Sequence, residues 1–171
     1  AGRFNWTRTG GTAAEPTGNY VAFCIELQQN VSNGGNYTYD VTAVALAPVP
    51  ASPFAPMGAA RADALARLWN AYYTNSGIDN TNAAAFQLCV WEIVFNDTTS
   101  FDLGTGQFQA TGNATTIALA NAWLVTAMDS NAPMASIYAL TSETNQDMLV
   151  PTPGAAALAG LGTLAAMRRK R

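Results

Sequence analysis

Three side chains in this sequence are suited to covalent or strong polar chemistry: the thiols of Cys24 and Cys89 and the amide of Gln87. Cys24 lies in an apolar segment with period-two alternation, which places it on the same strand face as Glu26. Gln87 lies in the middle of an apolar helical segment and shares a helical face with Trp91. A buried amide without a hydrogen-bond partner costs roughly 1–3 kcal/mol, so the sequence predicts a polar partner for Gln87.

The residue types that are missing exclude several kinds of catalytic and metal-binding site. The chain contains no His, so it can form neither a Ser-His-Asp triad nor a Cys-His dyad. Its carboxylates are scattered singly, without the spacing of a calcium loop, and we expect no metal site. Glu26 and Glu92 either flank the thiol and shuttle protons, or they are structural, with Glu92 paired to Arg61 or Arg67. The sequence therefore predicts a protein that is not an enzyme and has no cofactor.

The first part of the chain has the pattern of β-strands. Residues 3–8 and 19–27 are aromatic and β-branched with some alternation, and residues 37–44 alternate again. The turn residues Asn33, Gly34 and Gly35 predict a hairpin between the second and third of these segments. The proline-rich stretch 48–56 predicts an irregular crossing loop.

The middle of the chain changes to a helical period. Apolar residues recur at helical spacing over residues 58–74, from Thr81 or Asn82 to Phe95, and over residues 114–128. A short β excursion is expected at residues 101–110, and one or two last strands at residues 135–150. The predicted class is α+β, with an antiparallel sheet or sandwich, two or three inserted helices and a short apolar C-terminal helix.

The last residues form a separate segment, 150–171, that follows a globular domain of residues 1–149. The segment begins with Val150, Pro151, Thr152 and Pro153, continues through an uncharged stretch at 154–167, and ends in Arg168, Arg169, Lys170 and Arg171. As a helix, the stretch would be roughly 21 Å long, shorter than the ~30 Å hydrocarbon core of a bilayer. A transient membrane anchor fits this length better than a permanent span.

The order of proline motif, apolar helix and basic cluster resembles the PEP-CTERM sorting signal of Gram-negative bacteria. Thr152 stands where that family usually has Glu. The resemblance implies export across the inner membrane, removal of the tail by an exosortase-type protease, and a final location at the cell surface or in the extracellular matrix.

The charge distribution agrees with export. Half of the eight basic residues are the last four, so the net formal charge of −3 becomes −7 without them. An acidic domain lacks the basic footprint that nucleic-acid binding needs, and we expect no nucleic-acid partner. Lys170 is the only lysine, so the domain itself has no lysine side chain that could serve as a nucleophile.

The segments around Cys24 and Gln87 also resemble the thioester domains of bacterial surface adhesins. Those domains carry an aromatic-Cys pair and a later Thr-Gln-x-Ala-hydrophobic-Trp motif, to which Phe23-Cys24 and residues 86–91 correspond. Phe86 replaces the usual Thr, and Cys89 replaces the usual Ala. The resemblance implies a thioester between the Cys24 sulfur and the Gln87 side-chain carbonyl, covered by Trp91. An amine on a target would open it and become attached through an amide.

A disulfide between Cys24 and Cys89 is the competing interpretation, because two cysteines in an exported chain first indicate a bridge. Closing this long loop would stabilise the fold by about 4 kcal/mol in the chain-entropy model. Cys89 lies about 200° around the helix from Gln87, so one strand sulfur cannot easily reach both. Thioester, disulfide and free thiols therefore remain three separate hypotheses.

Two functions follow from these alternatives. The first is an exported binding or adhesion protein that attaches to an extracellular polymer or an amine-bearing protein surface. The second is a structural protein of the matrix or of a filament, capable of self-association and stabilised by the Cys24–Cys89 disulfide. A third, a carbohydrate-active enzyme, lacks a recognisable pair of acids.

Overall fold

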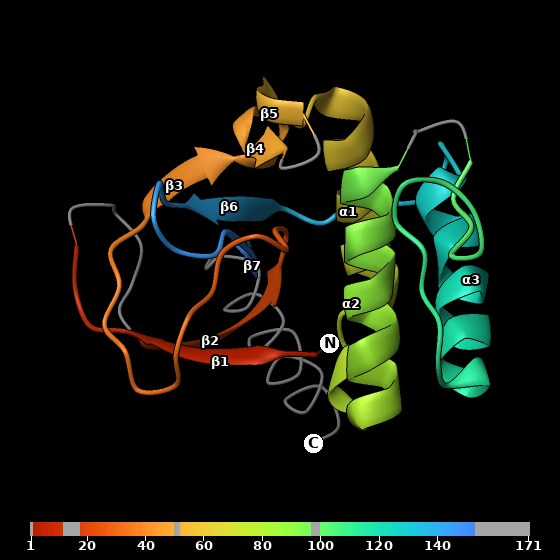
Figure 1. Ribbon diagram of the computed structural model, residues 1–171, viewed down its shortest axis with the longest axis horizontal. Coiled ribbons are helices and arrows are strands. Elements are labelled where there is room, and N and C mark those ends of the chain that lie inside the picture. The colour runs from red at the N-terminus through yellow and green to blue at the C-terminus, as the bar shows by residue number, and fades with distance from the viewer. Residues whose placement is uncertain (1, 12–17, 50–51, 97–99, 153–171) are drawn as a thin grey trace, which may run out of the picture.

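The computed structural model describes residues 2–11, 18–49, 52–96 and 100–152 (Figure 1). Its strands are β1 (Phe4–Arg8), β2 (Gly18–Cys24), β3 (Asp40–Ala43), β4 (Pro48–Val49), β5 (Ser52–Pro56), β6 (Ile137–Thr141) and β7 (Met148–Pro151). Its helices are α1 (Ala59–Tyr72), α2 (Asn80–Phe95) and α3 (Ala114–Met128), with short 3₁₀ turns η1 (Val44–Leu46) and η2 (Asn75–Gly77). The predicted α+β class is confirmed.

The main sheet is antiparallel and has the order β1-β2-β7-β6-β3. The N-terminal strands form its first edge, where β1 pairs with β2 from Phe4 opposite Ala22 to Arg8 opposite Gly18. The last strand of the described residues, β7, lies between β2 and β6. Residues from both ends of the chain therefore meet beside Cys24, which pairs with Met148 across β2 and β7.

The helices form a layer beside the sheet. Figure 1 shows α2 running between the strands and α3. The side chains of Asp79 and Asn113 accept the backbone N–H groups of Asn82 and Thr116, at 2.8 and 3.0 Å, and so cap the first turns of α2 and α3. Because α2 contacts β2 as well as the other two helices, apolar residues surround nearly its whole circumference.

Aromatic rings fill the space between the sheet and the helices. Phe86 of α2 is fully buried and lies against Phe23 of β2, Trp69 of α1 and Trp123 of α3. These four residues belong to the main core cluster. On the other side of β2, Cys24 belongs to a smaller buried cluster against which Trp91 packs.

Three predictions about the strands and loops are wrong. No hairpin joins β2 to β3, because β2 pairs with β1 and β7 while β3 pairs with β6. The proline-rich stretch is not only a loop, since it contains the strands β4 and β5, which pair with each other with a register shift between Pro48 and Val49. Residues 101–110 form turns instead of a strand, and the side chain of Asn96 accepts the backbone N–H groups of Gln107 and Phe108 there.

The C-terminal segment is described only at its start. Val150 and Pro151 belong to β7, and the Thr152 N–H donates to the Ser136 carbonyl at 3.1 Å. The proline motif therefore begins inside the sheet. Pro153, the predicted apolar helix and the basic cluster lie outside the described residues.

No helix within the described ranges is long and apolar enough to cross a membrane.

Candidate functional site

Cys24 is the last residue of β2 and lies at an edge where the neighbouring strand has stopped. The pairing with β1 ends at Phe4 opposite Ala22, so β1 does not pair with Cys24. The Ile25 N–H donates to the Asp147 carbonyl at 3.0 Å, on the β7 side. Backbone groups of successive strand residues point to opposite edges, so those of Cys24 point to the β1 side, where the ladder has ended.

The side-chain amide of Gln87 takes the place of the missing strand. Its Oε1 accepts the Cys24 N–H at 2.9 Å, and its Nε2 donates to the Cys24 carbonyl at 2.7 Å. Gln87 is 0% exposed and Cys24 is 1% exposed, so both bonds are shielded from water. The prediction that Gln87 needs a polar partner is confirmed, and the partner is the backbone of Cys24.

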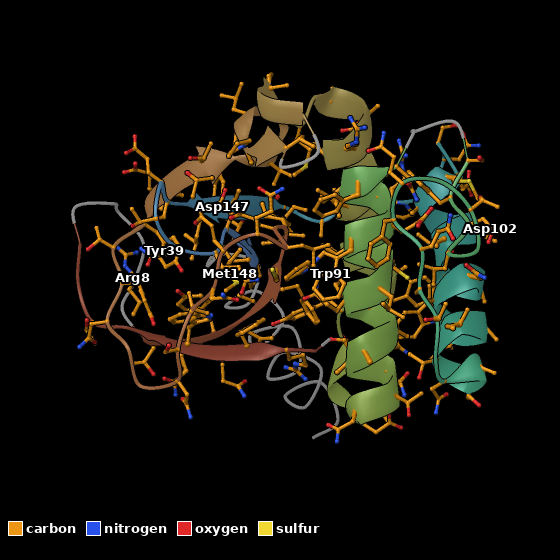
Figure 2. All side chains as sticks on the ribbon, viewed as in Figure 1. Arg8, Tyr39, Trp91, Asp102, Asp147 and Met148 are labelled. Carbon is orange, nitrogen blue, oxygen red and sulfur yellow. The ribbon has the colours of Figure 1, made fainter. Side chains whose placement is uncertain are left out.

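Cys24, Gln87 and Trp91 line one cavity of about 540 Å³. Arg3 and Leu27 are further lining residues, and the Leu27 side chain is exposed. Figure 2 shows Trp91 on the side of α2 that faces the sheet. The structure thus brings together the thiol, the amide and the indole that the sequence singled out, and places them beside one cavity.

The Cys24 thiol is held in its protonated form. It donates a hydrogen bond to the Glu26 carbonyl. Burial raises the pKa of Cys24 to about 11, and a backbone hydrogen bond with Glu26 and the nearby Trp91 indole lower it only in part. The negative charges of Glu26 and Asp147 raise this pKa further. A reaction at the sulfur therefore needs a group that accepts the thiol proton.

The Trp91 indole has its polar edge near this thiol. Its Nε1 is buried and finds no hydrogen-bond partner among the described residues. The N–H nevertheless lies close enough to the sulfur to lower the pKa of Cys24, although the pair does not meet the geometry of a hydrogen bond. An indole N–H can only donate, so a thiolate or a thioester oxygen nearby would satisfy it.

Two carboxylates lie close enough to the thiol to act on it through their charges. Glu26 and Asp147 are both buried, and the Asp147 N–H lies 3.4 Å from Glu26 Oε2. Burial raises the pKa of Asp147 to about 6, with a smaller contribution from the Glu26 charge, and burial also raises the pKa of Glu26. Asp147 was missed in the sequence analysis. Its position directly before the apolar Met148–Val150 segment is the local signal, but its proximity to Glu26 depends on the pairing of β2 with β7.

Cys89 lies on another face of α2, away from Cys24. Its thiol is fully buried in the main core and donates to the Ala120 carbonyl of α3 at 3.3 Å. Cys24 and Cys89 are both free thiols in this structure. The side of α2 that approaches Cys24 is the one that carries Gln87.

Glu92 is not part of the cavity lining. Its Oε1 accepts the Asp102 N–H at 2.9 Å, and burial raises its pKa. The predicted arginine partners bind backbone carbonyls instead: Arg61 donates to Asn96 and Arg67 to Ala127. The structure therefore places Glu26, but not Glu92, beside the thiol.

Within the described residues, no group of three or more potential metal ligands gathers at one place. Comparisons with protein-family models, with curated proteins and with solved structures find no match.

Proposed function

We propose that this protein is an exported surface or matrix-associated binding protein that attaches covalently to amines through a thioester between Cys24 and Gln87. The observation that carries the proposal is the pair of hydrogen bonds that hold the Gln87 amide against residue 24, beside a cavity. Gln87 is a buried polar residue on an otherwise apolar helix, and it faces the strand residue that carries a thiol.

The bond forms without oxidation or reduction. The Cys24 sulfur loses its proton and attacks the side-chain carbonyl carbon of Gln87, whose C–N bond then breaks. The amide nitrogen takes up that proton and leaves as ammonia. A primary amine of the target later attacks the same carbon, the C–S bond breaks, and the thiol regains a proton. The product is an amide between Gln87 and the target.

Neighbouring groups have defined tasks in these steps. The Cys24 N–H already donates to Gln87 Oε1, so it stabilises the negative charge that develops on this oxygen during each attack. Glu26 and Asp147 lie close enough to act on the Cys24 thiol through their charges, and we assign the acceptance of the thiol proton to one of these two carboxylates. Trp91 covers the cavity side of the sulfur and limits the access of water.

The target amine must come from another molecule or from a chain terminus, because the only lysine, Lys170, lies in the sorting segment. The PEP-CTERM-like tail supplies the route, with an exosortase-type protease and the inner membrane as transient partners. An extracellular polymer or protein surface that carries amines is the lasting partner.

Intact mass spectrometry of the purified chain tests the bond. Thioester formation releases ammonia, and we expect a mass about 17 Da below that calculated from the sequence. The variants Cys24→Ala and Gln87→Ala should each restore the calculated mass, while Cys89→Ala, the matched control at the other thiol, should keep the deficit. A loss of about 2 Da would instead indicate a disulfide, and an unchanged mass would reject both bonds.

Methylamine gives a second, chemical test. We expect it to add to the wild-type chain at Gln87 and to release a thiol that alkylating reagents can label. Cys24→Ala should abolish both changes. Addition that persists in this variant would refute the proposed site.

A further inference from the structure

The cavity beside Cys24 contains a cation that the thioester chemistry does not use. Arg3 directly precedes Phe4, the first residue of β1, and lines the cavity together with Cys24 and Gln87. Among the described residues of this lining, Arg3 is the only one with a permanent charge. Because it lines the same cavity as the reactive pair, it is a candidate for selecting the target.

Within the described ranges, Arg3 has no anion to pair with. Its side chain is partly buried, and its Nε is fully shielded without a hydrogen-bond acceptor. No carboxylate in the described part of the chain forms an ion pair with it. A shielded guanidinium donor without an acceptor is costly, and a carboxylate, sulfonate or phosphate oxygen is the acceptor it binds best.

The fold leaves room for this guanidinium. Gly77 of η2 lies directly beside it, and a Cβ at this glycine would come within 2.5 Å of the Arg3 terminal nitrogen. The Arg3 charge also acts on the neighbouring Tyr73, whose pKa is raised by burial and lowered in part by the arginine. The position of the cation is therefore built by β1, η2 and the end of α1.

The opposite charge lies on the other side of the thiol. Glu26 and Asp147 are close enough to raise the pKa of Cys24 through their negative charges. A ligand in the cavity thus meets a cation at Arg3, while the two carboxylates lie outside the lining and act through their charge. The field of these carboxylates attracts the charged form of an amine toward Cys24. An anionic group on the same molecule gains from Arg3.

We propose that the cavity selects primary amines that carry an anionic group a few bonds away, with Arg3 as the specificity-determining residue. The ligand class comprises amino-carboxylates, amino-sulfonates and amino-phosphates, including such groups at the end of a polymer or peptide. Amines with a second positive charge are disfavoured. This inference rests on the proposed thioester, because it concerns the amine that opens it.

Three amines in which two methylene groups separate the amine from a second group provide matched probes: β-alanine with a carboxylate, ethanolamine with a neutral hydroxyl, and ethylenediamine with a second amine. Each is incubated with the full chain at the same concentration of free base, and the rate of adduct formation is followed by intact mass. We expect β-alanine to react about tenfold faster than ethanolamine, since a charge-assisted pair is worth roughly a factor of ten. Ethylenediamine should be the slowest of the three.

Two variants tie the preference to the arginine. Arg3→Gln should reduce the ratio of the β-alanine rate to the ethanolamine rate to about one. Gly77→Ala, which fills the space beside the guanidinium, should lower the same ratio while the arginine is retained. Arg8→Gln, a matched change at the other end of β1, should leave the ratio unchanged.

The outcomes separate this inference from the proposed function. If methylamine and all three probes fail to react, the thioester itself is wrong and the inference falls with it. If methylamine reacts but the three probes react at equal rates, the thioester stands and the selection by Arg3 is overturned. The comparison of probes on the wild-type chain decides this even if a variant does not fold.

Discussion

Replacing Gln87 by Met tests how much the pair of hydrogen bonds to Cys24 contributes to folding. Met has nearly the same length and volume, so the change removes two hydrogen bonds without opening a large cavity. It leaves the N–H and the carbonyl of Cys24 without partners at a position that is 1% exposed. Each unsatisfied buried group costs about 1–3 kcal/mol.

Because the site borders a cavity, water can partly satisfy the two backbone groups, and we expect a total loss of about 2–3 kcal/mol. The measurement is urea unfolding in a Cys24→Ala background, where no thioester can form and only the hydrogen bonds are removed. With a slope of roughly 1–3 kcal/mol per molar urea, the midpoint should fall by about 0.7–3 M.

The exposed Gln28 provides the control, since Gln28→Met should change the free energy of unfolding by no more than about 0.5 kcal/mol. A loss of less than about 0.5 kcal/mol for Gln87→Met would refute the argument that this amide replaces the missing strand. In the chain that keeps Cys24, the same substitution also removes the thioester. A larger loss in that background would therefore measure the contribution of the covalent bond.

Further predictions concern the carboxylate behind the thiol, the aromatic core and the loop after α2. Burial raises the pKa of Asp147 from 3.8 to about 6, so the folded chain holds this proton more tightly than the unfolded chain. The free energy of unfolding of the wild type should therefore fall as the pH rises from about 4 to about 6. Urea titrations at each pH measure this dependence, and Asp147→Asn should remove it. Phe86→Ala should lower the free energy of unfolding by about 3–5 kcal/mol, because Phe86 is fully buried among three other rings. Asn96→Ala should lower the free energy of unfolding by about 2–4 kcal/mol and speed hydrogen exchange at the Gln107 and Phe108 amides, which donate to the Asn96 side chain. Unchanged exchange would show that the loop does not depend on the Asn96 side chain for its structure.

The three helices were predictable because their periodicity is local. The observed ranges of α1, α2 and α3 agree closely with the predicted ones, since an apolar side chain every three or four residues is encoded by near neighbours. The start of α2 was less clear, and the cap is Asp79 instead of Thr81 or Asn82. Short polar side chains occur at all three positions, and only the backbone geometry selects one.

The pairing of the strands was not predictable in the same way. The turn residues near Gly34 suggested a hairpin, but the sheet instead places β7, from residues 148–151, beside β2. Alternation identifies a strand and its faces, while its neighbours depend on how distant segments pack. This is why Asp147 and Arg3, which approach Cys24 from opposite ends of the chain, were missed as residues of the site.

The sequence by itself determined that a glutamine in an apolar helix needed a partner, that no histidine chemistry was available, and that the domain without its tail is acidic and free of lysine. Only the tertiary structure decided which residue of α2 faces Cys24. The large side chain of Phe86 and the buried Cys89 turn toward the aromatic core and α3, and this sets the rotation of α2 so that Gln87 reaches the open edge of β2. Helical phase relative to a sheet is a property of packing between layers, and it cannot be obtained from the periodicity of either element alone.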